Sequence, residues 1–352
     1  METSMTPLYE SGELTDADGF TPLRVKQVVP ETADAVSLVL DIPAPARDQF
    51  RYLAGQFVTI LVPINGTEHR RCYSMSSSPA VEADLRITVK RDRDGLVSNW
   101  INDTVRVGDV LHTASPEGRF VLTAADRDIV TFAGGSGITP VYSLVRSALA
   151  TTDRRARLFY ANRDPESVIF GNALADLADS HGGRFQLHHH LDDRAGVVTP
   201  QHITDFLGDG TTHADYYICG PAPFMDTVER ALLGAGIPGQ QLHLERFTVA
   251  AIPAPDPSEA AVTEEVTIEL GRSTVTAPYR AGNTLLQTAR LAGLKAPSSC
   301  ETGSCGTCMA QVVQGSARML NNDALDDDEI AEGWVVTCQA LPTSRTVRVV
   351  YE

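Results

Sequence analysis

The sequence has no long uninterrupted apolar run. Its most apolar long stretch, residues 129–150, is broken by glycines, Pro140 and Arg146. A membrane-spanning helix needs about 20 predominantly apolar residues in succession, so no transmembrane segment is predicted. The N-terminal residues 1–18 are polar and acidic, without the basic start and apolar centre of a secretory signal. We therefore expect a cytoplasmic chain with a loose N-terminal tail at residues 1–18.

Positive charge is also scarce. Lys and Arg number 29 against 45 Asp and Glu, so the formal net charge is -16. This charge repels phosphate backbones and anionic lipid surfaces, and binding to nucleic acid or to a membrane is not expected. Internal repeats and low-complexity tracts are lacking as well. With 43% hydrophobic residues, the chain has enough apolar side chains for ordinary buried cores.

Cysteine is rare outside the final quarter of the chain. Of 6 cysteines, Cys72 and Cys219 stand alone, and the others are Cys300, Cys305, Cys308 and Cys338. Without a secretory signal, such clustering favours metal ligation over disulfides. The C-x4-C-x2-C spacing followed by a distant cysteine is that of a plant-type [2Fe–2S] cluster. The alternative is a structural zinc site, although zinc sites usually pair C-x2-C elements.

The length of 352 residues exceeds one compact core and allows two or three domains at about 100–200 residues each, of which we expect three. Residues 19–125 contain short alternating runs, such as 36–40, 57–61 and 85–89, which predict an antiparallel β-barrel. In residues 126–249, apolar strands at 129–133, 157–161 and 216–219 alternate with helix-like stretches at 141–149, 173–177 and 224–233. That alternation predicts an α/β, doubly wound parallel sheet.

The remaining residues predict a linker and a third domain. Residues 250–262 combine Pro, Ala and acidic residues without apolar periodicity, which is typical of a semi-stiff linker. Residues 263–352 hold strand-like stretches at 266–270 and 346–351 and a helix-like stretch at 283–294. An α+β domain around the four cysteines is expected.

Two motifs in the α/β region suggest a nucleotide site. The turn Gly134-Gly-Ser-Gly-Ile-Thr-Pro140 follows a strand and precedes a helix, so its bare backbone can admit a pyrophosphate to amides at the helix N-terminus. Cys219-Gly-Pro221 ends a later strand, where ligands collect in open α/β sheets. Alone, Cys219 is equally consistent with a small buried apolar residue.

With these motifs, Arg71-Cys-Tyr-Ser74, Gly95-Leu-Val-Ser98 and the cysteine segment resemble the ferredoxin-NADP reductase superfamily. They are most similar to oxygenase reductases with a C-terminal plant-type ferredoxin domain, which implies a β-grasp fold for that domain. Sequences such as Tyr160-Ala-Asn-Arg163 resemble the branch that serves 3-ketosteroid 9α-hydroxylases.

The resemblance implies site residues of several kinds. In the family, Arg71 meets the flavin pyrophosphate, a task suited to its planar charged fork. Tyr73 and Ser74 lie against the isoalloxazine, Phe247 covers a flavin face, and Cys219 stands near the nicotinamide. Flavin contacts are implied for Arg71, Tyr73, Ser74, Val89, Lys90, Gly95, Val97, Ser98, Thr139 and Phe247. Nucleotide contacts are implied for Gly134, Gly135, Gly137, Asn162, Arg163, Cys219, Gly220 and Pro221. Catalytic roles are implied for Ser74, Cys219 and Glu245, and ligation for Cys300, Cys305, Cys308 and Cys338.

These parts together imply an electron path. Nicotinamide donates hydride, whereas an iron–sulfur cluster carries single electrons, and a flavin connects the two kinds of carrier. We expect NADH-dependent reduction of FAD, then of the cluster, then of a Rieske-type oxygenase. NADPH remains an alternative, since Arg163 suits a 2′-phosphate while Asp164 and Glu166 disfavour one. FMN remains an alternative to FAD, because the resemblance extends to the phthalate dioxygenase reductase group, which shares the domain order and uses FMN.

Other readings of the whole chain stay open. By the same resemblance, the acceptor can be a phenylacetyl-CoA epoxidase or an aromatic-ring oxygenase. Glu301 stands where many plant-type ferredoxins carry Arg, and this charge reversal beside the cluster weakens the assignment of a steroid hydroxylase as partner. A flavin oxidase that acts directly on a small molecule is another alternative. So is a non-enzymatic redox carrier or sensor, although the glycine turn and the Cys219 motif argue against it.

Two clusters of polar residues receive structural interpretations. Adjacent histidines on a strand point to opposite faces, so His188, His189 and His190 cannot all converge on one ion. The acidic run from Asp326 to Glu329 is expected to begin a helix, where carboxylates favour the helix dipole. A basic docking partner is the alternative for that run.

Overall fold

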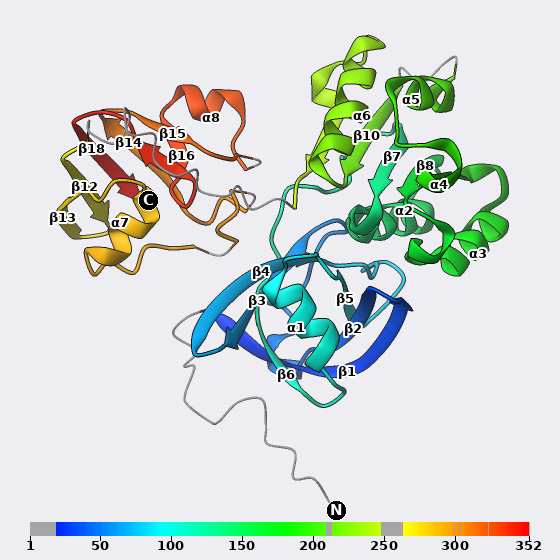
Figure 1. Cartoon of the computed structure of the whole chain (residues 1–352), viewed down its shortest axis with the longest axis horizontal. Coiled ribbons are helices and arrows are strands. Elements are labelled where there is room, and N and C mark those ends of the chain that lie inside the picture. The colour runs from blue at the N-terminus through cyan, green and yellow to red at the C-terminus, as the bar shows by residue number, and fades with distance from the viewer. Residues whose placement is uncertain are drawn as a thin grey trace, which may run out of the picture. The chain divides into compact units, whose positions relative to one another are not determined.

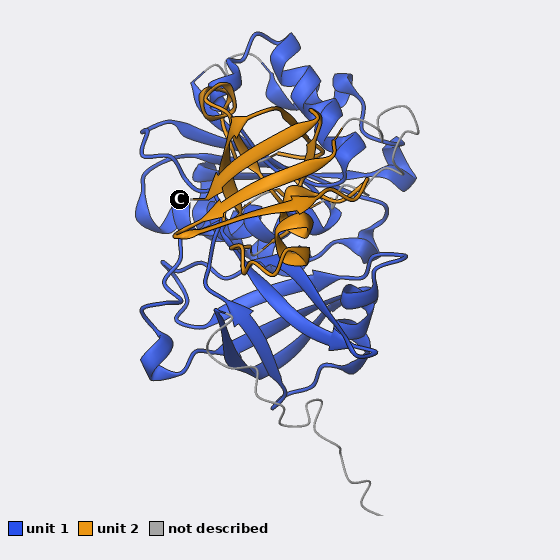
Figure 2. Cartoon of the chain, turned by 90° about the vertical axis from the view of Figure 1, so that its left-hand side faces the viewer, with its two compact units in different colours: residues 1–245 blue, residues 246–352 orange. Residues whose placement is uncertain are grey.

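The computed structural model describes residues 19–208, 213–247 and 263–351, apart from residues 299, 304 and 323. The chain divides into two compact units, Met1–Glu245 and Arg246–Glu352 (Figure 2). The predicted tail at 1–18 and the predicted linker at 250–262 lie outside the described residues.

The first unit begins with an antiparallel sheet in the strand order β4-β3-β6-β1-β2-β5 (Figure 1). Its elements are β1 (Phe20–Thr32), β2 (Ala35–Asp41), β3 (Phe57–Ile64), β4 (Thr67–Ser74), β5 (Leu85–Lys90), α1 (Leu96–Thr104) and β6 (Val110–Ala114). An antiparallel bridge between Met75 and Ile87 joins the two ends of the sheet and closes it as a barrel.

The barrel interior follows from the alternating pattern of its strands. Leu23, Leu38, Val58 and Leu85 come from different strands and belong to one buried cluster. Residues one position away point outward because side chains alternate across a strand. The predicted antiparallel barrel is therefore confirmed.

The second part of the first unit is an α/β layer with the strand order β11-β10-β7-β8-β9, all pairs parallel. Its elements are β7 (Asp128–Gly134), α2 (Ile138–Thr151), β8 (Ala156–Asn162), α3 (Gly171–His181), β9 (Phe185–Leu191), α4 (Asp192–Ala195), α5 (Pro200–Leu207), β10 (Ala214–Cys219), α6 (Ala222–Gly234) and β11 (Leu242–Glu245). Short 3-10 turns are η2 (Ala44–Ala46), η3 (Gly135–Gly137), η4 (Pro165–Ser167), η5 (Gly182–Arg184) and η6 (Gly239–Gln241).

Helices cover both faces of this parallel sheet. Val141 of α2 and Leu174 of α3 belong to one buried cluster, while Ile203 of α5 and Val228 of α6 belong to another. The predicted doubly wound sheet is thus confirmed. The strand order reverses direction between β7 and β10, the place where open α/β sheets bind their ligands.

The C-terminal unit is a mixed sheet that packs on one helix. Its elements are β12 (Glu265–Leu270), β13 (Ser273–Pro278), α7 (Leu285–Leu291), β14 (Met309–Gln314), β15 (Ala317–Met319), α8 (Asp327–Ala331), β16 (Trp334–Val336), β17 (Ala340–Pro342) and β18 (Thr346–Tyr351). The main sheet has the order β13-β12-β18-β14-β16, with β12 and β18 parallel. Leu285 and Leu286 of α7 pack against Val266 and Val349, as expected for a β-grasp domain.

Helix α7 is shorter than the stretch 283–294 that its sequence suggests. Thr284 caps its start by accepting a hydrogen bond from the Gln287 N–H at 3.2 Å. Gly293 follows with φ +82, a left-handed conformation that ends α-helical geometry. Among the described helices, none combines the length and apolar character needed to cross a membrane.

Candidate functional site

The glycine turn and the Cys219-Gly-Pro motif meet where the strand order reverses. A Cβ atom added to Gly137 would lie 2.1 Å from the Cys219 carbonyl oxygen, and one added to Gly220 would lie 3.0 Å from the Gly134 Cα. Contacts this close exclude side chains, so glycine is required for the two turns to touch. The structure therefore brings together two motifs, the glycine turn and the Cys219-Gly-Pro motif, that lie far apart in the sequence.

A cavity of about 480 Å³ opens beside this junction. The residues that line it are Asp34, Lys90, Arg91, Gly134, Gly135, Ala161, Asn162, Arg163, Asp192, Val197, Val198, Pro221, Pro223, Phe224 and Thr227. The first three come from the barrel, and the others lie at the carboxyl ends of the parallel strands, in the segments that follow them, or on α6. The volume is within the range of small-molecule and cofactor sites.

Asn162 presents unused hydrogen-bonding groups to this cavity. Its amide is buried, and neither the amide nitrogen nor the amide oxygen has a hydrogen-bond partner among the described residues. Burial raises the pKa of the neighbouring Tyr160 hydroxyl and the Asn162 side chain lowers it by a smaller amount, while that hydroxyl itself donates to the Gly135 carbonyl and accepts from the Ile169 N–H. Because buried amides are normally hydrogen-bonded, Asn162 fits a polar ligand.

Lys90 extends from the end of β5 over the glycine turn. A Cβ atom added to Gly135 would meet only its ammonium, at 3.6 Å, among the described atoms within 4 Å. Burial lowers the pKa of Lys90, and the nearby Asp34 carboxylate opposes that shift. The cation and the bare turn together make a suitable place for an anionic phosphate group.

Asp34 links the barrel to the α/β layer at the rim of the cavity. Its Oδ2 atom lies 3.2 Å from Arg163 Nη2 and 4.0 Å from Lys90 Nζ. The Thr32 hydroxyl donates to its Oδ1 atom at 2.8 Å. Arg163 is therefore partly neutralised, and this pairing has no sequence signal because the two residues are far apart in the chain.

Cys219 and Glu245 are neighbours on adjacent strands. They are paired in the parallel register of β10 and β11, and both are buried. Burial, with a smaller effect of the Glu245 carboxylate, raises the pKa of the Cys219 thiol well above its usual value. Cys219 is thus a neutral thiol at physiological pH rather than a reactive thiolate.

The predicted flavin residues Arg71, Tyr73 and Ser74 lie along the last part of β4. The Ser74 hydroxyl is buried and has no hydrogen-bond partner among the described residues. Burial raises the pKa of the Tyr73 hydroxyl, while Arg71 lowers it by a smaller amount. The exposed Arg71 and the unpaired Ser74 hydroxyl fit a polar, phosphate-bearing ligand on this strand.

The second predicted flavin element begins helix α1. Gly95 precedes the helix, and a Cβ atom there would lie 2.3 Å from Ser98 Oγ. The Ser98 hydroxyl donates to the Gly95 carbonyl at 3.3 Å. Val89 and Val97 are buried in the barrel core. These side chains support the barrel, so the backbone N–H groups at the start of α1 are what this element offers to an anion.

Thr139 and Phe247 complete the predicted flavin set. The Thr139 hydroxyl is buried and donates to the Ser136 carbonyl at 3.0 Å, within the glycine turn. Phe247 is 40% exposed and belongs to the C-terminal unit. Their flavin contacts remain predictions.

The four clustered cysteines form two adjacent pairs. Cys300 is hydrogen-bonded to Cys305, which together with burial raises the pKa of Cys305. Cys308 is hydrogen-bonded to Cys338, which raises the pKa of Cys338 and lowers that of Cys308. Among the described residues, no three or more Cys, His, Asp or Glu side chains are placed so that they could bind one metal ion together. Two pairs suit a two-iron cluster, which four thiolates hold.

Backbone amides point at these sulfur atoms. The Thr302 and Thr307 N–H groups each approach the preceding cysteine sulfur at 3.4 Å, and the Cys338 N–H approaches Cys308 at 3.5 Å. Gly303 and Gly306 have φ values of +90 and +76, which glycine adopts without strain. Amide donors around thiolates are what an iron–sulfur cluster needs, so the loop fits the predicted group.

Glu301 departs from the usual pattern of such a loop. It has φ +57, although it is not glycine. Arg290 of α7 pairs with its carboxylate at 2.6 Å, and the Gln339 amide donates to its carbonyl oxygen at 2.8 Å. These contacts hold the left-handed backbone beside Cys300 and pair the carboxylate charge.

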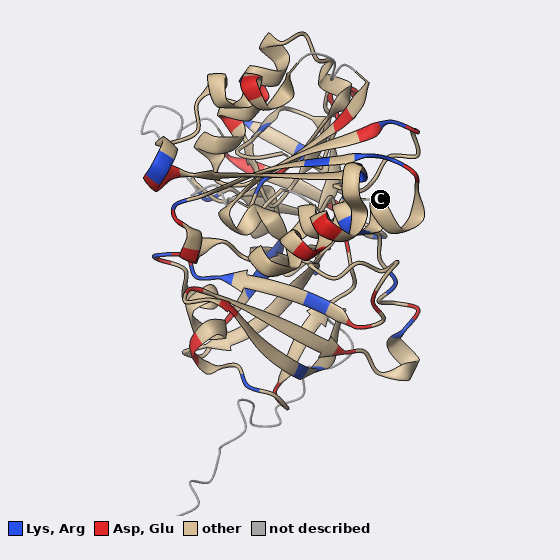
Figure 3. Cartoon of the chain, turned by 90° about the vertical axis from the view of Figure 1, so that its right-hand side faces the viewer, with Lys and Arg blue, Asp and Glu red and all other residues tan. Residues whose placement is uncertain are grey.

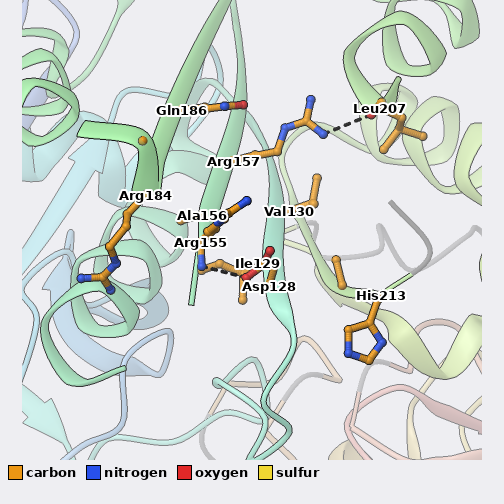
Figure 4. A pocket seen from close by; sticks show the side chains of 12 residues that line it. Asp128, Ile129, Val130, Arg155, Ala156, Arg157, Arg184, Gln186, Leu207 and His213 are labelled. Atoms are coloured by element: carbon orange, nitrogen blue, oxygen red, sulfur yellow. Dashed lines mark hydrogen bonds between the residues drawn. The ribbon is translucent and has the colours of Figure 1, made fainter. Parts of the chain in front are cut away.

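A second cavity, about 220 Å³, lies at the opposite end of the parallel sheet (Figure 4). Arg157 donates to the carbonyls of Phe206 and Leu207, which end α5, and Arg184 donates to Leu149 and Thr152 at the end of α2. Figure 4 shows the two guanidinium groups pointing in different directions. Both arginines therefore cap helices, and they do not converge on a common ligand.

The three histidines follow the alternation of β9. His188 and His190 stack on Phe159, with ring centroids 5.1 and 5.5 Å apart, whereas His189 lies against Tyr160. The expected opposite orientation is confirmed. The acidic run also behaves as expected, because Asp326 caps α8 by accepting a hydrogen bond from the Glu329 N–H at 2.8 Å.

Charge in the first unit and the C-terminal unit is mixed. Figure 3 shows Lys and Arg residues interspersed with Asp and Glu residues along the described ribbon.

Family descriptions match three stretches of the chain. An oxidoreductase FAD-binding domain covers residues 22–122, an oxidoreductase NAD-binding domain covers 132–230, and a 2Fe-2S iron-sulfur cluster binding domain covers 268–343. The matches agree with the barrel, the doubly wound sheet and the C-terminal unit.

Several relatives match this chain over nearly the whole length of both chains. The ferredoxin reductase component of 3-ketosteroid-9-alpha-monooxygenase from Mycobacterium tuberculosis is 38% identical over 96% of this chain and 100% of its own length. The component of the same name from Rhodococcus rhodochrous is 36% identical over 93% and 95% of the two chains. A component of 1,2-phenylacetyl-CoA epoxidase from Escherichia coli is 32% identical over 95% and 98%.

A solved structure extends the match to three dimensions. Phthalate dioxygenase reductase, described as a modular structure for electron transfer from pyridine nucleotides to [2Fe-2S], has a TM-score of 0.63 and 28% identity. The match covers 96% of this chain and 99% of that one.

Proposed function

This chain belongs to the NAD(P)H-dependent reductase components of oxygenase systems that join FAD-binding, NAD-binding and 2Fe-2S domains, and on that basis we propose its specific role. It takes electrons from NADH and passes them singly to a Rieske-type oxygenase, a 3-ketosteroid 9α-hydroxylase. The observation that carries the donor side is the junction of Gly137 with Cys219 beside the cavity.

The nucleotide is held by groups at the carboxyl edge of the parallel sheet. Lys90 and the bare backbone of Gly134 to Gly137 receive the pyrophosphate. Asn162 supplies the unpaired buried amide to a polar group of the nucleotide, and Arg163 lies farther along the same edge. Pro221 lines the cavity on the other side, and Gly220 lets its turn pack closely against Gly134, so both are assigned to the nucleotide site.

Cys219 and Glu245 orient the reacting ends. As a neutral buried thiol, Cys219 offers a polarisable contact to the nicotinamide without a negative charge of its own. Glu245 of β11 is paired with Cys219 of β10, and it positions polar groups near the site of hydride transfer. Neither residue is required to abstract a proton from a substrate.

On the barrel side, Arg71 binds a flavin phosphate, and Tyr73 and Ser74 line the isoalloxazine. The bound flavin supplies the exchange between a hydride donor and a one-electron acceptor. Ser74 donates its otherwise unpaired hydroxyl to the flavin, and the start of α1 at Gly95 offers backbone N–H groups. FAD is favoured over FMN by the family match.

Cys300, Cys305, Cys308 and Cys338 hold the cluster, and the surrounding amides stabilise negative charge on their sulfurs. We assign the flavin, nucleotide and cluster domains to residues 19–125, 126–249 and 263–352. Because NADH is a cytoplasmic donor, the cytoplasm is the proposed location.

The decisive experiment is an anaerobic titration of the loaded protein with NADH and, separately, with NADPH. The visible spectrum should show flavin bleaching followed by cluster reduction, with NADH the better donor. If neither nucleotide reduces a fully loaded flavin, the reductase proposal fails and a redox carrier or sensor takes its place. Rapid reduction of dioxygen without a partner would instead favour an oxidase.

The acceptor is tested by reconstitution. The reduced protein is mixed with the oxygenase component of a 3-ketosteroid 9α-hydroxylase or with the remaining components of a phenylacetyl-CoA epoxidase. Product formation coupled to NADH oxidation is expected with the steroid system. Turnover only with the epoxidase would support the second candidate, which the 32% identical relative favours.

A further inference from the structure

Two charged residues that line the cavity, Asp34 and Arg163, form an ion pair beside the proposed nucleotide site. Asp34 lies in the turn between β1 and β2, and its side chain is 28% exposed. It reaches Arg163 at 3.2 Å and Lys90 at 4.0 Å, and the Thr32 hydroxyl fixes its other oxygen at 2.8 Å. A carboxylate from the barrel therefore stands against a cation of the nucleotide-binding layer.

We propose that Asp34 is a specificity-determining residue that engages Arg163 and so discriminates against a nucleotide carrying a 2′-phosphate. This inference rests on the proposed function, since it assumes that the cavity binds NADH or NADPH. It goes further by naming the residue that selects between the two donors.

The position of Arg163 explains why it matters. Arg163 follows β8, the second strand of the α/β layer, directly after Asn162. In doubly wound folds the end of this strand faces the adenosine ribose, where an acidic residue binds the 2′-hydroxyl or an arginine accommodates the 2′-phosphate. An arginine already paired with Asp34 is a poorer phosphate ligand, because a second anion must displace or repel the first.

The other charged groups near the cavity do not pair with Arg163 in the way that Asp34 does. The Asp164 carboxylate is used within η4, where it accepts a hydrogen bond from the Ser167 N–H at 2.8 Å. Arg91 pairs instead with Asp103 at 2.6 Å. Asp192 also lines the cavity and adds negative charge that disfavours a phosphate.

Lys90 does not discriminate between the two nucleotides. Its ammonium stands over Gly135, at the place proposed for the pyrophosphate, which NADH and NADPH share. Removing the Asp34 charge frees Lys90 for both donors. The selective part of the effect therefore depends on Arg163.

The test compares kcat/KM for NADPH and NADH in the loaded wild type, in Asp34→Asn and in Asp34→Asn/Arg163→Gln. Asp34→Asn should raise the NADPH/NADH ratio about tenfold, mainly by lowering the KM for NADPH, which corresponds to about 1.4 kcal/mol. The double variant should lose that gain. Asp84→Asn, which removes a barrel carboxylate paired with Lys26 at 2.8 Å, is the matched control and should leave the ratio unchanged.

Equilibrium binding provides a readout without turnover. Calorimetry with 2′-phospho-ADP and with ADP should show tighter binding of the former to Asp34→Asn, and no such change in the double variant. An unchanged ratio and unchanged binding in Asp34→Asn, while NADH still reduces the flavin, would overturn this inference and leave the proposed function intact. An equal gain in both variants would also overturn it, because Arg163 would then have no part. Failure of the wild type to react with either nucleotide would refute the proposed function itself.

Discussion

The hydroxyl of Tyr160 joins the glycine turn to the strand beside it. It donates to the Gly135 carbonyl oxygen at 3.2 Å and accepts a hydrogen bond from the Ile169 N–H at 3.2 Å. Burial raises the pKa of this hydroxyl, so it stays protonated and able to donate. One phenol thus sets the position of the turn that is proposed to receive the pyrophosphate.

We expect Tyr160→Phe to lower the free energy of unfolding by about 1–3 kcal/mol, because the buried Ile169 N–H loses its partner. The KM for NADH should rise at the same time, since the turn is no longer held. Thermal unfolding and steady-state kinetics measure the two effects. Unchanged values of both would show that the turn holds its position without Tyr160.

Gly137→Ala should disable the nucleotide site. The new Cβ atom would lie 2.1 Å from the Cys219 carbonyl oxygen, so the two turns must move apart. A displacement of about 1 Å can reduce a rate about a hundredfold, and we expect a loss of that order in flavin reduction by NADH. Stopped-flow spectroscopy follows the reaction.

The matched control for this change is Gly183→Ala. A Cβ atom at Gly183 has no neighbour within 4 Å among the described atoms. Flavin reduction should be as fast as in the wild type. If Gly137→Ala also reacted at the wild-type rate, the junction would not be part of the nucleotide site.

Ser74→Ala and Ser76→Ala should affect different properties of the protein, flavin reduction in the first case and stability in the second. Both hydroxyls are buried, but Ser76 shares a hydrogen bond with Thr88 at 2.7 Å, whereas Ser74 has no partner among the described residues. Ser76→Ala should lower the unfolding free energy of the flavin-free protein by about 1 kcal/mol. Ser74→Ala should leave that quantity unchanged and slow flavin reduction.

Chemical denaturation of flavin-free protein and rapid-reaction kinetics of loaded protein separate these outcomes. A clear loss of stability in flavin-free Ser74→Ala would indicate that its hydroxyl has a structural role. That result would remove the argument for a flavin contact.

Cys338→Ala should prevent cluster assembly. It removes one thiolate of the pair with Cys308, and four thiolates are required. Iron and acid-labile sulfide analysis should show almost none of either, while flavin content stays normal. Cys72→Ala is the control, because Cys72 lies on β4 in the barrel and should leave iron content unchanged. Retention of a full cluster in Cys338→Ala would contradict the ligand assignment.

Asp215 predicts a pH-dependent contribution to stability. Burial alone would raise the pKa of its carboxyl, but hydrogen bonds from Thr123 and Arg127 outweigh burial and hold the pKa below its usual value. A lowered folded-state pKa stabilises the protein above the unfolded-state value, about 3.9, and the contribution disappears as pH falls through the folded-state value.

Asp215→Asn should therefore lower the unfolding free energy by about 3 kcal/mol at neutral pH, with a smaller difference from the wild type below about pH 4. Denaturation at a series of pH values tests this. The exposed Asp84→Asn control should change stability by less than about 1 kcal/mol. A difference that does not depend on pH would mean that the carboxylate charge is not responsible.

Local sequence patterns predicted most of the architecture. The alternation of residues 85–89 and the glycine turn at 134–137 depend on neighbours in the chain, and both lie in the expected elements. The cysteine spacing predicts four ligands of one cluster, and the structure shows Cys300 beside Cys305 and Cys308 beside Cys338. By contrast, Asp34 and Arg163 meet only because the barrel and the α/β layer pack side by side, and no local periodicity records that contact.

The sequence also did not predict which side chains of a motif point toward a ligand. Val97 and Ser98 belong to a segment that resembles a flavin-contacting element, yet Val97 packs in the barrel core and Ser98 stabilises its own turn. A motif of this kind identifies a stretch of backbone. Which of its side chains faces a ligand depends on the helix start at Leu96 and on the packing beneath it.

The separation of the hydrophobic cores has a consequence for the history of such chains. In the part of the chain that the structure describes, the buried cluster that contains Val266 and Val349 consists only of residues from the C-terminal unit. The buried residues of the other clusters all belong to the first unit. Each unit can therefore accumulate substitutions in its interior without repacking the other. Recombination at the boundary near Glu245 would therefore leave the packing inside both units unchanged.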